Sequence, residues 1–236
     1  MPVGAQLFAT ASVSITEQQS SDVRVLALML LARTLSNVRA VLSLIDNGYI
    51  VEAKTISRCV YENSYWVGAL VREGDAFRAA MVHHEMKHKR MRAKTIFETA
   101  EEFRGSEIAE KLRQWMREHK EYEDSPTLDP KAVANRAQNE SYMFYQHLSW
   151  DAHPSIQTLN RYYVAPDESG IPGIDAAPIV PEAEAVETLN LMCLAAIGVL
   201  LGVRELVKSS APIETIAREY QELTNLTSQV AARRDT

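Results

Sequence analysis

The chain has 236 residues, of which 46% are hydrophobic and 24% charged, and its formal net charge at pH 7 is −6. This composition supports a sizeable buried core with a globular surface, and it excludes a disordered chain. The acidic balance argues against broad nonspecific binding to duplex nucleic acid, which needs many Lys and Arg contacts with phosphate. Binding of nucleic acid through a local basic patch stays open, although the net charge does not indicate it.

The two cysteines, Cys59 and Cys193, lie far apart in apolar surroundings, so we expect no disulfide and a reducing compartment. Residues 1–16 have neither the basic nor the apolar segment of a signal peptide, and we expect a flexible N-terminal arm there. The longest apolar run, residues 191–203, is shorter than the roughly twenty residues of a membrane span. We therefore expect a cytoplasmic protein with a core helix at this run, a short membrane anchor being the alternative.

Two long helices are expected in the first third of the chain. Apolar residues at three-and-four spacing predict a helix over residues 17–46, which Asn47-Gly48 ends because both residues tolerate a left-handed cap. A second helix follows over residues 50–72 and ends at Gly74. The short connection between them indicates an antiparallel helical hairpin.

The middle of the chain predicts three further helices. One runs over residues 75–103 and a second over 107–121, with the break at Gly105-Ser106. Asp129 as an N-cap and Pro130 at the first helical position start a fifth helix, which we expect to continue to Leu148.

The last part of the chain contains one long irregular segment. Residues 164–181 hold four prolines and two glycines, which predicts a loop with a small hairpin around residues 167–170. Two helices follow, over residues 181–208 and 212–230. The whole pattern predicts an all-α fold, in which residues 17–236 form a single-domain bundle of about seven helices.

The first candidate for a functional site is a charged pair in an apolar helix. Arg58 and Glu62 are four residues apart and therefore share one helix face. If the pair is buried, removing one partner costs about 3–5 kcal/mol, because the other charge is left uncompensated. The spacing alone favours a structural ion pair over the floor of a ligand pocket, at about two to one.

A second group of polar residues lies at the end of the fifth expected helix. Ser149, Asp151 and His153 offer the residue types of a nucleophilic triad. The sequence predicts no nucleophile elbow and no sheet to hold one. We therefore expect Asp151 to cap the next turn and Ser149 to hydrogen-bond to the backbone.

Histidines in the third expected helix offer a metal-binding alternative. His84, Glu85 and His88 have the spacing used in carboxylate di-iron bundles, but the second such motif that those bundles need is missing. Lysines and arginines crowd the segment and disfavour a dication. We expect a solvated polar face, no metal and no cofactor.

An Arg and His spacing typical of helical ribonucleases also occurs. Arg78 precedes His83 and His84, and Arg113 precedes His119, at separations of five or six residues. Chance accounts for about one such pair in a chain of this composition. Arg78 is also followed by an alanine, where those ribonucleases place a polar residue.

Several short motifs follow one another in the first two thirds of the chain. They are Asn47-Gly48-Tyr49, Glu52-Ala53, Arg58-x3-Glu62 and Tyr145-x2-Leu148-Ser149-x3-His153-Pro154. Together they resemble a widespread bacterial family of all-helical domains of unknown function, over about residues 25–165. Some members look similar to helical nucleotide-binding and ribonuclease-like domains of phage defence. The resemblance implies that the Arg, Glu, Ser and His converge.

We therefore expect Arg58, Glu62, Ser149 and His153 to form one buried polar cluster, since buried polar groups need partners. Three functions stay open: a ligand-binding or interaction module, a ribonuclease-like toxin or phage-defence protein, and a metal-dependent helical-bundle enzyme. Whether the chain is an enzyme is left undecided. The expected partner is a small ligand or a protein, with no membrane, and a homodimer through an apolar helix face is a further alternative.

Overall fold

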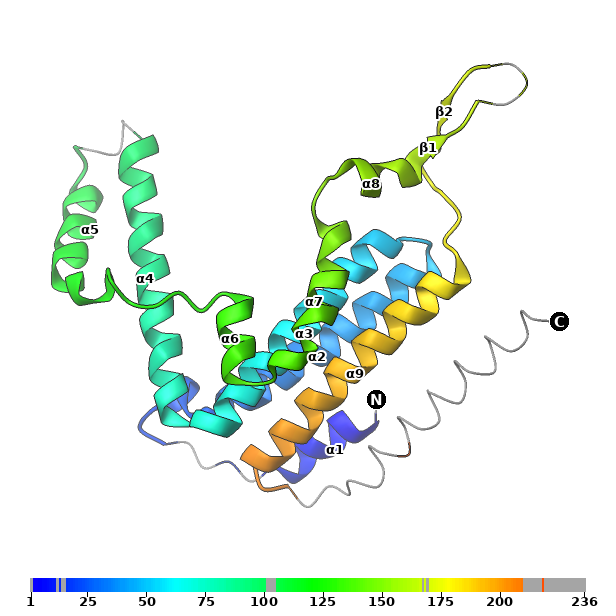
Figure 1. Cartoon of the computed structure of the whole chain (residues 1–236). Helices are drawn as coiled ribbons and strands as arrows, with labels where there is room; N and C mark the ends of the chain where they lie inside the picture. The colour runs from blue at the N-terminus through cyan, green and yellow to red at the C-terminus, as the bar shows by residue number, and fades with distance from the viewer. Residues whose placement is uncertain are drawn as a thin grey trace.

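The computed structural model describes residues 2–11, 13, 16–100, 105–166, 168, 170–209 and 218. Within them the chain is all-α, with nine α-helices and one pair of two-residue strands (Figure 1). The predicted fold class is confirmed. The predicted helix at 212–230 lies outside the described residues.

Three long helices form the centre of the bundle: α2 (Val23–Asp46), α3 (Ile50–Glu73) and α9 (Glu182–Leu206). They lie side by side, and α3 contacts the other two along its length (Figure 1). Apolar residues recur on α3 at three-and-four spacing, so one broad stripe of the helix is buried. The expected break after α3 is present at Gly74, which has a positive φ of 54°.

The packing of α9 on α3 is close because α9 has a glycine at the contact. A Cβ atom at Gly202 would lie 2.5 Å from Cγ1 of Val67 on α3, nearer than real carbon atoms approach. Gly198, one turn earlier on α9, leaves more space, since a Cβ atom there would lie 3.8 Å from Cβ of Ser64. Of these two positions, Gly202 is therefore the one at which the two helices approach more closely.

The N-terminal segment contains a helix that the sequence did not predict. Helix α1 (Pro2–Thr10) packs beside α2, and its Leu7 is fully buried in a core cluster with Leu31 and Val199. The hydroxyls of Thr10 and Ser209 hydrogen-bond at 2.7 Å. The segment expected as a flexible arm therefore contains a helix with a buried apolar side chain, and its flexibility stays a prediction.

Helices α4 (Asp75–Thr99) and α5 (Glu107–Glu118) form a hairpin that projects from the bundle (Figure 1). Phe77 at the start of α4 is buried against the bundle, whereas α4 is the main neighbour of α5 among the described residues. Both helices agree with the sequence prediction, although the α4 helix ends at Thr99.

The predicted fifth helix is wrong as a single element. Asp129 caps it as expected, accepting a hydrogen bond from the Ala132 amide at 2.8 Å, but the chain forms two helices, α6 (Pro130–Arg136) and α7 (Tyr142–Ser149). The break between α6 and α7 coincides with two contacts with α3. Ala137 packs against Gly68, and the carbonyl of Ser141 accepts a hydrogen bond from the Tyr65 hydroxyl at 3.1 Å.

A short helix, α8 (Ile156–Leu159), leads into strands β1 (Tyr163–Val164) and β2 (Gly173–Ile174). The strands pair antiparallel, with Tyr163 opposite Ile174, and protrude from the molecule (Figure 1). This agrees with the predicted irregular segment and its hairpin. We call residues 163–174 the arm.

Two described helices, α2 and α9, are long and apolar enough to cross a membrane. The core helix of a soluble protein has the same composition, and both helices contribute buried residues to the core. The core helix expected over residues 191–203 is therefore present as part of α9. The cytoplasmic location stays a prediction.

Candidate functional site

Arg58 and Glu62 lie together on α3, at the rim of the bundle. Nη2 of Arg58 is 3.7 Å from Oε1 of Glu62, and both side chains are about a quarter exposed. The hydroxyl of Tyr145 on α7 joins them, accepting from Arg58 and donating to Glu62 at 3.3 Å each. Burial raises the pKa of Tyr145, and the Glu62 carboxylate raises it further. The phenol therefore stays neutral and keeps its donor.

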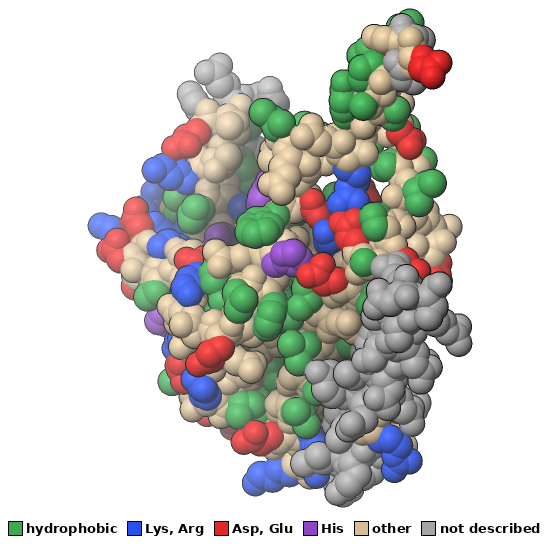
Figure 2. Space-filling model, turned by 45° about the vertical axis from the view of Figure 1, so that its right-hand side comes forward, with side chains coloured by type: hydrophobic (Ala, Val, Ile, Leu, Met, Phe, Trp, Pro, Cys, Tyr) green, Lys and Arg blue, Asp and Glu red, His purple; other side chains and the backbone are tan. Residues whose placement is uncertain are grey.

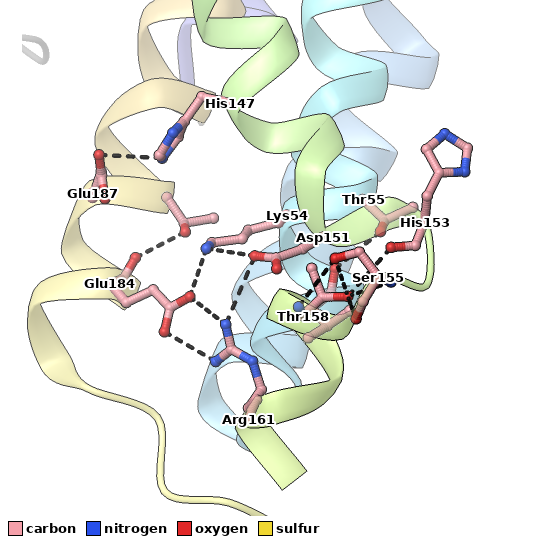
Figure 3. Close-up of polar contacts among 12 residues, drawn as sticks. Lys54, Thr55, His147, Asp151, His153, Ser155, Thr158, Arg161, Glu184 and Glu187 are labelled. Carbon is pink, nitrogen blue, oxygen red and sulfur yellow. Dashed lines mark hydrogen bonds and ion pairs between the residues drawn. The ribbon is translucent and has the colours of Figure 1, made fainter. Parts of the chain in front are cut away.

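Ser149 and His153 do not complete the expected cluster. The Ser149 hydroxyl donates to the carbonyl of Tyr145 at 2.7 Å, as favoured from the sequence. His153 is exposed, and its imidazole points away from the neighbouring polar residues (Figure 3). One buried cluster of all four residues is therefore wrong. His153 precedes Pro154 and has an extended backbone (φ −119°, ψ 137°), which turns it out of the helical path. Ligand binding by these residues stays a prediction.

A different ion-paired group lies in the interior, one helical turn before Arg58. Nζ of Lys54 donates to Oδ2 of Asp151 at 2.7 Å and to Oε1 of Glu184 at 2.5 Å (Figure 3). Arg161 donates to both oxygens of Glu184, at 3.0 and 2.6 Å. Nη2 of Arg161 also lies 3.7 Å from Oδ2 of Asp151. We call these four residues the Lys54 network.

The network joins four separate segments of the chain. Lys54 comes from α3, Asp151 from the 3₁₀ turn after α7, Arg161 from the turn after α8, and Glu184 from the first turn of α9. The side chains are 9 to 19% exposed. Two cations and two carboxylates are therefore largely removed from water with their charges balanced, as buried charges require.

The pKa shifts follow from this pairing. Burial alone lowers the pKa of the Lys54 ammonium, but its hydrogen bonds to Asp151 and Glu184 outweigh burial, and the pKa is raised. The hydrogen bonds from Arg161 lower the pKa of Glu184 to about 2 against the opposing effect of burial, and Lys54 contributes in the same direction. Lys54, Arg161 and Glu184 are consequently ionised at neutral pH.

The Lys54 network forms the floor of a cleft of about 810 Å³, which we call the Lys54 cleft. Figure 2 shows acidic, basic and histidine side chains gathered in this hollow below the protruding arm. One wall carries Trp150, whose side chain is largely exposed, and another carries Pro178 and Ile179. The amide side chains of Gln157 and Asn160 also line the opening. The cleft therefore offers an aromatic face, an apolar wall and neutral polar groups above a charged floor.

The network leaves some hydrogen-bonding capacity unused. Among the described residues, the hydrogen bonds and ion pair of Asp151 use Oδ2 and leave Oδ1 without a partner. Lys54 donates two of its three ammonium protons. The network therefore retains one unused acceptor and one unused donor on paired residues that line the cleft.

Sequence reasoning missed Lys54, Arg161 and Glu184, and treated Asp151 as a cap. The partners of Lys54 lie 97 and 130 residues away, so no local spacing connects them. A signal for Lys54 was present, because it follows Ile50 by four residues and precedes Ser57 and Tyr61 by three and seven. A lysine in this buried stripe needs a partner.

The histidines considered for a metal make other contacts. Nδ1 of His84 accepts a hydrogen bond from the Leu128 amide at 3.0 Å, and burial lowers the pKa of this imidazole. Glu85 pairs with Lys89 and Arg92. Within the described part of the chain, no group of three or more His, Cys, Asp or Glu side chains is arranged to hold a metal ion.

The residues at ribonuclease-like spacing likewise have local partners. Arg78 donates to Asp75 at 2.8 Å, and Arg113 donates to Glu110 at 3.1 Å. The ring of His119 stacks on Trp115. These contacts are those of ordinary helix faces, and none of them favours a phosphodiester site.

A protein-family model described as a family of unknown function (DUF5677) matches residues 24–171, more than half of the chain. The chain belongs to this family. The DUF5677 match spans Lys54, Asp151 and Arg161, whereas Glu184 lies beyond it. The comparisons with curated proteins and with solved structures found no similar protein. The expected resemblance to an uncharacterised helical family is confirmed, and the likeness to phage-defence domains stays a prediction.

Proposed function

We propose that this DUF5677 protein is a cytoplasmic binding module whose ligand site is the Lys54 cleft. The observation that carries the proposal is the Lys54 network itself, in which two basic and two acidic side chains from four segments are paired at the floor of an open cleft. A buried ion network is weak evidence for stability, because hydrophobic residues of similar volume often do as well. Its position under a cleft with an exposed tryptophan favours a role in binding.

The chemistry of the floor suggests the kind of ligand. Because its charges balance, a free anion such as phosphate gains no net attraction there. Oδ1 of Asp151 and the third proton of Lys54 instead suit a small neutral or zwitterionic molecule with both a donor and an acceptor. An apolar or aromatic portion would pack against Trp150 and Ile179. Free amino acids and nucleosides have this combination.

A thermal-shift screen tests the proposal. The probes are the free amino acids, the four common ribonucleosides, inorganic phosphate and spermidine. We expect at least one amino acid or nucleoside to raise the melting temperature, since a ligand at one hundred times its Kd stabilises by about 2.7 kcal/mol. Phosphate and spermidine should have no comparable effect.

Variants locate the binding site. Trp150→Ala removes an exposed side chain, so it should leave the fold intact and abolish the ligand-induced shift. Trp115→Ala, on α5 and outside the cleft, is the matched control and should keep the shift. A shift that survives in Trp150→Ala, or a panel without any stabilising amino acid or nucleoside, would contradict the proposal.

A further inference from the structure

The arm and its continuation expose large apolar side chains to a degree unusual for a soluble protein. Ile171, Ile174 and Ile179 are 72, 79 and 93% exposed, and Tyr163 is about half exposed. Tyr163 and Ile174 pair across the two strands. A two-stranded hairpin is marginally stable alone in water, and clustered exposed apolar residues mark interaction surfaces. The arm therefore has the properties of an element that packs against another molecule.

The charge of the arm limits the kinds of molecule against which it can pack. Residues 162–181 contain Asp167, Glu168 and Asp175 and neither lysine nor arginine. Such a segment is repelled by nucleic acid and by an anionic membrane surface. It is complementary to an apolar surface with a basic border.

The α4–α5 hairpin presents such a surface. A groove of about 340 Å³ lies between its helices, with Phe97 and Met116 among the apolar side chains and Arg113, Arg117 and Lys120 among the basic ones. A smaller pocket beside it adds Lys87, Met91 and Lys94. Several of these cations have intramolecular carboxylate partners, such as Glu110 for Arg117, but cations still outnumber carboxylates in the lining. We call this surface the α4–α5 groove.

We propose that two copies of the chain form a closed dimer in which the arm of each copy packs into the α4–α5 groove of the other. The arm and the hairpin of α4 and α5, which carries the groove, lie on opposite sides of the same end of the molecule (Figure 1). A two-fold axis between them would place each arm beside the other copy's groove and make both contacts at once. Two equivalent contacts bury twice the surface of one. This matters because a specific interface buries about 1,600 Å² of surface in total. The dimer would also hold Pro178 and Ile179, which continue from the arm, in the wall of the Lys54 cleft.

Sedimentation velocity of the full chain over a range of concentrations tests the dimer. We expect reversible dimerisation that weakens at high salt, since the contact joins acidic and basic surfaces. The arm variant Ile171→Asp/Ile174→Asp and the groove variant Arg117→Glu/Lys120→Glu should each weaken it by at least about tenfold. Met143→Asp changes a similarly exposed apolar residue on α7 and should leave the dimer unchanged.

Mixing the two variants distinguishes reciprocal exchange from any other interface. The arm variant keeps its groove and the groove variant keeps its arm, so a mixed dimer retains one of the two contacts. It should form more readily than either variant alone and less readily than the wild type. A monomeric wild type, a dimer insensitive to both variants, open-ended assembly or an RNA-binding groove in a monomer would each overturn the proposal. Circular dichroism of the variants checks that each is folded.

Discussion

At the scale of single residues, Glu184 is the member of the Lys54 network that we expect to affect the pH dependence of stability most. It accepts hydrogen bonds from both cations of the Lys54 network, and its side chain is only 17% exposed. Folding therefore favours the ionised carboxylate strongly, and the pKa lies near 2 instead of 4.5. A group with a lowered pKa in the folded state stabilises the fold above its unfolded pKa and loses this effect as the pH falls toward the folded value.

We therefore predict that the free energy of unfolding falls between about pH 4.5 and pH 2, by up to about 3 kcal/mol from Glu184. Urea denaturation at a series of pH values measures this. Glu184→Gln should be less stable at pH 7 and should flatten the curve over the acidic range. Asp22, whose pKa is also lowered to about 2 by its hydrogen bond with Arg24, keeps part of the dependence in the variant. An unchanged slope in Glu184→Gln would contradict this account.

At the scale of elements, the contact between α3 and α9 depends on a missing side chain. We predict that Gly202→Ala lowers the free energy of unfolding by about 1–3 kcal/mol, because the added methyl group overlaps Val67 and forces the helices apart. Gly198→Ala is the matched control on the same helix, and it should be neutral or stabilising by up to about 1 kcal/mol. Equal effects of the two substitutions in thermal or urea denaturation would show that close packing at Gly202 does not matter.

The elements also show which parts of the fold local sequence determines. Helices α3 and α4 were predicted within a few residues, because an apolar stripe and Gly74 are local signals. The break between α6 and α7 was missed, since it coincides with packing of Ala137 on Gly68 of α3, which is distant in the sequence. The Lys54 network was missed for the same reason. Arg58 and Glu62, four residues apart, were found, but their connection through Tyr145 was not.

At the scale of the whole molecule, stability is expected to be uneven. The bundle of α2, α3 and α9 holds most of the buried residues, whereas α4 is the main described neighbour of α5, and the arm protrudes (Figure 1). We predict that hydrogen exchange is slowest in the centre of α3 and much faster in α5 and the arm, because local opening needs less free energy where few apolar contacts break. Mass spectrometry of peptides measures this. Similar protection in α3 and α5 would contradict it.

The position of Glu184 relative to the family match has a consequence for other members. Three charges of the floor fall within the DUF5677 region, and the fourth comes from the chain that follows it. Without Glu184, the two cations would be paired with a single carboxylate, and the floor of the Lys54 cleft would carry a net positive charge. A member with a neutral residue at the position of Glu184, in the first turn of its α9, should therefore prefer anions in the same cleft. Ligand preference could then diverge within the family through one position outside its shared region.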